Sequence, residues 1–133
     1  MTENGNGGGP SRADRRAAIL GLAGKLDTEP AVFPGPDGPI DVLVRELSGE
    51  QAREWEVAVA KHAPSTIGFL LQLSVIDPVD NLPIFEVADR QTLEAIGISK
   101  LNPVLKLAQK LNGISDSDIE QAKRDLLAAQ STG

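Results

Sequence analysis

The chain has no cysteine and no tyrosine, and its 133 residues include one histidine and one tryptophan. Without cysteine it can form neither a disulfide nor a thiolate-ligated metal site, a composition that suits a reducing compartment. Aromatic residues make up 3% of the sequence, too few for the stacking platforms that bind single-stranded nucleic acid. These absences exclude several classes of binding site.

Long apolar runs and an excess of basic residues are also missing. The longest uncharged apolar stretch, residues 67–76, has ten residues, whereas a membrane-spanning helix needs roughly 20. The formal net charge of −6 opposes general binding to phosphate backbones. The start lacks the basic flank and apolar core of a signal peptide, so we expect no secretion, no membrane association and no nucleic-acid partner.

The first eleven residues, MTENGNGGGPS, are rich in glycine and contain no apolar pattern. We therefore predict a disordered leader over residues 1–11, followed by one compact helical domain over residues 12–130. The fold class that we expect is mainly α with a small β-hairpin.

The N-terminal part predicts a helix followed by the hairpin. Residues 12–26 place apolar side chains at helical spacing, but Gly21 and Gly24 weaken the helix, which we expect to form only when packed against something. Pro36-Asp37-Gly38 supplies turn chemistry between two short apolar segments, residues 32–33 and 40–44. The pattern there is typical of a β-hairpin.

The middle of the chain predicts a capped helix and a buried segment. Ser48 and Gln51 form a capping box for a helix that runs to about His62, with Trp55 on its inner face. For the apolar run 67–76, periodicity leaves helix and strand open. We favour a helix up to about Leu73 with an extended exit through Val75 and Ile76.

The C-terminal part predicts three helices. Asp89 can cap the first, which ends before Gly97, and Asn102 with Pro103 can start the second. Asn112-Gly113 ends that helix, and Ser115 or Asp116 starts the last one.

Apolar side chains of the last two helices form stripes at helical spacing. The residues that we expect to face a partner are Leu101, Leu105, Ala108, Ile119 and Leu126. The same spacing serves a helix pair within one chain equally well, and the sequence leaves that alternative open. The residues that we expect mainly in the core are Trp55, Phe69, Leu73, Val75 and Phe85.

No catalytic or metal-binding constellation is recognisable. His62 stands at a helix end with no nucleophile to serve, which favours a surface role. Asp77, Asp80 and Asn81 lack the pattern of a calcium loop, so we expect a turn there and no metal or cofactor. Residues 77–94 hold five acids and one base, which predicts either a solvated acidic rim or a docking surface for a basic helix.

Four passages carry a resemblance by their order and spacing. Residues 29–34 read EPAVFP, and residues 42–51 read VLVRELSGEQ, a strand followed by a helix start. The apolar run ends in SVID and re-emerges as LPIF before Asp89, and residues 105–113 read LKLAQKLNG. Together they resemble the tail assembly chaperones of long-tailed bacteriophages, particularly those of phages that infect actinobacteria, over about residues 25–127.

The chain departs from that family at one turn. Where the family pattern has a glycine, this sequence has Asp80-Asn81. Asparagine is the next best residue for the left-handed backbone conformation, so the same turn remains available.

The resemblance implies a non-catalytic protein of the host cell cytoplasm. It implies binding to the tape measure protein, which is thereby kept soluble, and recruitment of tail tube subunits. Members of the family are commonly made in two lengths by a programmed frameshift. A homo-oligomer is left open, as are two other functions: a small structural tail or connector subunit retained in the virion, and a small hydrolase that uses the acids near Asp77.

Overall fold

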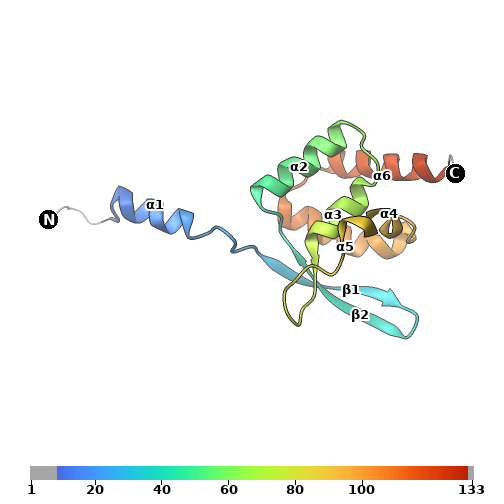
Figure 1. Ribbon diagram of the computed structural model, residues 1–133, viewed down its shortest axis with the longest axis horizontal. Coiled ribbons are helices and arrows are strands. Elements are labelled where there is room, and N and C mark those ends of the chain that lie inside the picture. The colour runs from blue at the N-terminus through green and yellow to red at the C-terminus, as the bar shows by residue number, and fades with distance from the viewer. Residues whose placement is uncertain (1–8, 132–133) are drawn as a thin grey trace.

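The computed structural model describes residues 9–131 of the chain. Figure 1 shows a body of helices and a hairpin, with the first helix standing apart from it. The elements in order are α1 (Arg12–Leu20), β1 (Thr28–Gly35), β2 (Gly38–Arg45), α2 (Gly49–Ala60), α3 (Thr66–Ser74), β3 (Val75–Ile76), a 3-10 turn (Val87–Asp89), α4 (Arg90–Leu93), α5 (Ile98–Asn112) and α6 (Asp116–Ser131). The predicted fold class, mainly α with a small hairpin, is confirmed.

The predicted hairpin is present and gains a third strand. β1 and β2 pair antiparallel, with Gly35 opposite Gly38 at the turn. β3 then pairs antiparallel with β2, so that the strand order is β1-β2-β3. Val42 and Val44 are buried, whereas Ile40 is 51% exposed because it lies toward the tip of the hairpin.

The central element of the body is α3. Ile67, Leu70 and Leu71 on this helix are fully buried, and α2, α4, α5 and α6 all contact it. The Trp55 indole is also buried, and its Nε1 donates to the Thr66 carbonyl oxygen at 2.8 Å. The predictions of a core tryptophan and of a helix with an extended exit through Val75 and Ile76 are therefore confirmed.

Of the five side chains expected in the core, Trp55 and Val75 are fully buried. Phe69, Leu73 and Phe85 are partly buried and pack against the core from its edge.

Two predicted helix boundaries are wrong. The helix expected from Asp89 to Ile96 is a 3-10 turn and the four residues of α4, and α5 begins at Ile98, with Gly97 as its N-cap. Asn102 and Pro103 therefore lie inside α5 rather than at its start. The amides of Lys100 and Leu101 already donate to the Gly97 carbonyl oxygen, so the helix is established before the proline, whose missing N–H costs one hydrogen bond.

The predicted N-terminal helix is present as α1, but it ends at Leu20 rather than near residue 26 and, among residues 9–131, stands apart from the body. None of its residues is buried. A capping box stabilises its start: the Ser11 hydroxyl accepts from the Asp14 amide at 3.0 Å, and the Ser11 amide donates to the Asp14 carboxylate at 3.2 Å. Most of the predicted disordered leader, residues 1–8, lies outside the described residues.

Candidate partner-binding groove

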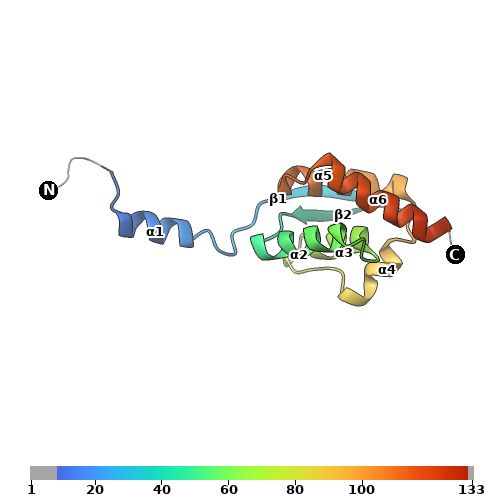
Figure 2. The ribbon, with the colours of Figure 1, turned by 90° about the horizontal axis from the view of Figure 1, so that it is seen from above.

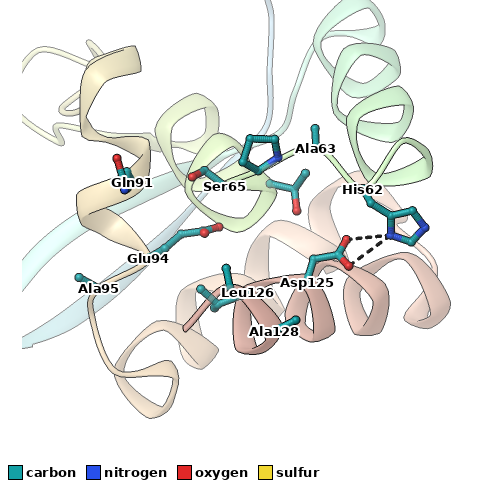
Figure 3. A pocket seen from close by; sticks show the side chains of 12 residues that line it. His62, Ala63, Ser65, Gln91, Glu94, Ala95, Asp125, Leu126 and Ala128 are labelled. Carbon is teal, nitrogen blue, oxygen red and sulfur yellow. Dashed lines mark hydrogen bonds and ion pairs between the residues drawn. The ribbon is translucent and has the colours of Figure 1, made fainter. Parts of the chain in front are cut away.

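A groove of about 550 Å³ lies where the α2–α3 junction, α4 and the end of α6 meet (Figure 3). Half of its lining is small or apolar. These residues are Ala63, Pro64, Ala95, Leu126, Ala128 and Ala129. Polar side chains from all three segments line the rest.

The α2–α3 junction turns sharply because two of its residues adopt left-handed backbone conformations. His62 has φ 51° and Ser65 has φ 62°, and Pro64 stands between them. A proline has no N–H to donate, so α2 cannot continue through it. The turn places the first residues of α3 at the edge of the groove (Figure 3).

The N-terminus of α3 is capped by a residue distant in sequence. Ser65 occupies the N-cap position but makes no side-chain cap. Instead the Glu94 carboxylate accepts from the Gly68 amide at 3.0 Å and also from the Ile67 amide. A negative group at a helix N-terminus satisfies free amides and interacts favourably with the helix dipole.

Glu94 is the buried carboxylate of the groove. Its residue is 9% exposed, and burial raises the pKa of its carboxyl, while the two amide hydrogen bonds act in the opposite direction. Glu94 is thus an exception to the predicted acidic rim: it faces α3 rather than solvent.

The wall formed by α4 is held against α3 by Arg90. Its guanidinium donates to the Gln72 side-chain oxygen at 3.0 and 2.8 Å and lies 3.8 Å from the centre of the Phe69 ring. Gly68 makes the approach possible, because a Cβ added there would lie 2.0 Å from the Arg90 carbonyl oxygen. The α4 wall therefore has a fixed position.

The opposite wall is held by His62 and α6. His62 Nδ1 lies 3.2 Å from the Asp125 carboxylate, which also accepts from the Gln121 side chain at 3.0 Å. The imidazole is 61% exposed, which confirms the predicted surface role of His62. In Figure 3 the Ser65 hydroxyl lies on the Gln91 side of the groove, away from the imidazole.

All five residues predicted to face a partner are inside the domain. Their exposed fractions are 0% for Leu101, 1% for Leu105, 0% for Ala108, 3% for Ile119 and 4% for Leu126. They belong to one core cluster, which is the intramolecular alternative that the spacing allowed. Leu126 also lines the groove.

The predicted turn at Asp77 is confirmed. The Asp77 carboxylate accepts from the Val79 amide at 2.8 Å, and the Asp80 carboxylate accepts from the Leu82 amide at 3.0 Å. Asn81 takes the left-handed conformation with φ 62°. Both aspartates therefore support the backbone of the turn.

Among residues 9–131, no group of three or more histidines, aspartates and glutamates is arranged to hold a metal ion. No helix in the described part of the chain combines the length and hydropathy that crossing a bilayer requires.

Comparison with known proteins identifies the fold. No protein-family model and no curated protein sequence matches the chain. The solved structure of the bacteriophage HK97 tail assembly chaperone matches with a TM-score of 0.54 and 24% sequence identity, over 76% of this chain and 99% of that one. The chain therefore has the fold of the bacteriophage HK97 tail assembly chaperone, the fold that the sequence resemblance implied.

Proposed function

We propose that this protein is a non-catalytic phage tail assembly chaperone, which binds the tape measure protein in the host cytoplasm and keeps it soluble. The observation that carries the proposal is the structural match, which accounts for 99% of the HK97 chain. The ordered sequence passages support the same conclusion independently.

The groove offers a binding mode for such a client. A long helix that awaits encapsulation exposes apolar side chains, which a groove can cover in a helix-in-groove arrangement. The alanines at positions 63, 95 and 128 leave room for such side chains, and His62 and Asp125 offer polar contacts at one side. We propose that one apolar stripe of the tape measure helix lies in this groove.

Co-expression tests the proposed function. The tape measure protein is produced alone and together with this chain, and its soluble fraction and co-purification are measured. We expect a clear rise in soluble tape measure protein and recovery of a complex. No rise, with no co-purification, would refute the proposed role.

Recruitment of tail tube subunits is a further part of the proposal. We expect the complex of chaperone and tape measure protein to capture purified tail tube protein, and capture that does not depend on the chaperone would exclude this step. A slippery heptanucleotide in the last codons of the gene is the corresponding expectation for an extended, frameshifted form.

A structural subunit of the same fold would remain in the particle. Mass spectrometry of purified virions separates the two functions, since a chaperone is absent or present only in traces. Stoichiometric recovery of this chain from virions would favour the tail or connector subunit.

A further inference from the structure

Within the described part of the chain, residues 9–131, α1 stands apart from the packed body. It has nine residues, none of them buried, and Ile19 and Leu20 are 65% and 56% exposed. An isolated helix of this length is marginal in water, since about 12–15 residues are needed even with favourable sequences. A partner that covers α1 would therefore stabilise it.

The chemistry of α1 specifies the partner. Arg12, Arg16 and Ile19 follow one another at a spacing of four and three residues, which places them on one face of the helix. With three arginines and one aspartate, α1 carries a net charge of +2. A complementary surface must combine carboxylates with exposed apolar side chains.

The same chain carries such a surface in residues 77–89, here called the acidic loop. It contains four acids and no base. Its exposed large apolar residues are Val79, Leu82, Ile84 and Val87, with Val79 90% exposed.

The acidic loop is well ordered by its own hydrogen bonds. The Asp77 amide donates to the Leu82 carbonyl oxygen at 2.9 Å, and Ile76 pairs with Pro83 as an isolated bridge. The loop therefore presents its apolar side chains without a further ordering cost.

α1 and the residues that join it to β1, 12–27, are here called the arm, and in this conformation α1 lies away from the acidic loop of its own chain. The C-terminal end of the arm is fixed at Asp27. The Asp27 amide donates to the Glu46 carboxylate at 2.9 Å, and its carbonyl oxygen accepts from the Glu46 amide at 2.8 Å. Gly24 and Asn81 line a common groove of about 400 Å³, so the arm starts beside the loop. From there α1 runs away from the body in both views (Figures 1 and 2).

The segment between α1 and Asp27 contains hydrogen-bonded turns. The amides of Leu22, Ala23 and Lys25 donate to carbonyl oxygens three residues earlier, so residues 19–25 form hydrogen-bonded turns. These turns join α1 to the rest of the arm in its extended direction, in which a second molecule can approach it.

We propose that α1 of one copy docks on the acidic loop of a second copy, with its arginines facing the carboxylates and Ile19 among the exposed apolar side chains. The contact is head-to-tail, because arm and loop are different surfaces of the same chain. It does not involve the groove assigned to the client, so the inference stands apart from the proposed function. The contact joins a helix of nine residues to one loop. Because it is small, we expect weak association, with a Kd on the order of 10–100 μM.

The test uses two variants of the full chain, each with one half of the contact removed. Arg12→Glu with Arg16→Glu reverses the charge of the arm, and the new acids stand near the helix start, where the dipole favours them. Val79→Ser with Leu82→Ser removes exposed apolar side chains of the loop without adding charge. Val57→Ser, at a 45% exposed position on α2, controls for the loss of an exposed apolar side chain.

Sedimentation is measured over a concentration series at about 50 mM and 0.5 M salt. We expect wild type and the Val57 control to associate at low salt and to dissociate at high salt, and each double variant to stay monomeric. Mixing the two double variants restores one intact arm and one intact loop, so a 1:1 dimer and nothing larger should form.

Two results would overturn the inference. The first is a wild-type chain that is monomeric at all concentrations, whether α1 folds onto its own loop or its arginines bind anionic phosphatidylserine vesicles instead. The second is a mixture of the variants that stays monomeric while circular dichroism shows both folded.

Discussion

Gly68 is the residue at which α3 and α4 approach most closely. The Cβ of an alanine at this position would lie 2.0 Å from the Arg90 carbonyl oxygen, so α4 must shift and its hydrogen bonds to Gln72 must weaken. We predict that Gly68→Ala lowers the free energy of unfolding by about 3 kcal/mol. Urea denaturation measures the change.

Gly49 provides the matched control, because it is the first residue of α2 and a Cβ there would meet nothing within 4 Å. We expect Gly49→Ala to be neutral or to raise the stability slightly. Equal effects of the two substitutions would show that the close approach of α3 and α4 is not required.

Glu94 makes the stability of the protein depend on pH in a definite direction. Burial raises the pKa of its carboxyl in the folded state. The folded state then binds the proton more tightly, so this residue adds stability below the unfolded pKa of about 4.3, and the contribution is lost as pH rises through the folded pKa.

Glu94→Gln removes the titration and keeps an oxygen that can accept from the Gly68 amide. We predict that the stability of wild type relative to this variant falls as the pH rises from about 4.3 through the raised pKa of the folded state. Urea denaturation at several pH values measures it. A difference that stays constant or increases with pH contradicts the assigned cause.

At the scale of whole elements, the stripe on α5 and α6 is the core of the domain rather than a surface. Leu105 is 1% exposed, whereas Leu127 on α6 is 55% exposed. A carboxylate at position 105 would be buried without a partner, so we predict that Leu105→Asp unfolds the protein. Leu127→Asp should change the stability by no more than about 0.5 kcal/mol.

Circular dichroism and thermal unfolding distinguish the two variants. A folded Leu105→Asp protein would mean that α5 can leave the core. In that case the stripe could still serve a partner, as the sequence alone allowed.

Local signals predicted the elements that depend on neighbouring residues. The capping box at Ser48 and Gln51 is present, and Gly113 ends α5 in the left-handed conformation with φ 59°. The predicted start of α5 was wrong because Asn102-Pro103 is a local start signal, whereas the helix begins at Ile98 with Gly97 as its N-cap. A strong local signal therefore does not fix a boundary when an earlier start is available.

The candidate groove could not be predicted from local signals. The carboxylate that caps α3 belongs to Glu94, 26 residues from Gly68, from whose amide it accepts a hydrogen bond. In addition, a glycine inside an apolar helix does not indicate which backbone carbonyl packs against it. Periodicity likewise groups Leu101 and Leu105 on one face but does not say whether that face meets the same chain or another. Such questions are decided by tertiary packing.

At the scale of the whole molecule, the chain has a packed body with two separate outward surfaces. The groove lies between the α2–α3 junction, α4 and α6, while α1 and the acidic loop stand outside the core. The proposed client binding and the proposed self-association can therefore be tested with separate substitutions. This separation allows one function to be tested while the other stays intact.

The central claim is that the groove holds an apolar helix of the tape measure protein. The most direct measurement is the affinity of the purified chain for that helix by isothermal titration calorimetry, for wild type and for Ala95→Arg with Ala128→Arg. Both positions line the groove and are exposed. Leu127→Arg, a neighbouring exposed residue of α6 that does not line the groove, is the control.

We predict binding by wild type and by the control, and a loss of at least about tenfold in affinity, or 1.4 kcal/mol, for the groove variant. Equal affinities for all three proteins, with the groove variant folded, would contradict the assignment of the groove. Absence of binding by wild type would contradict the account as a whole.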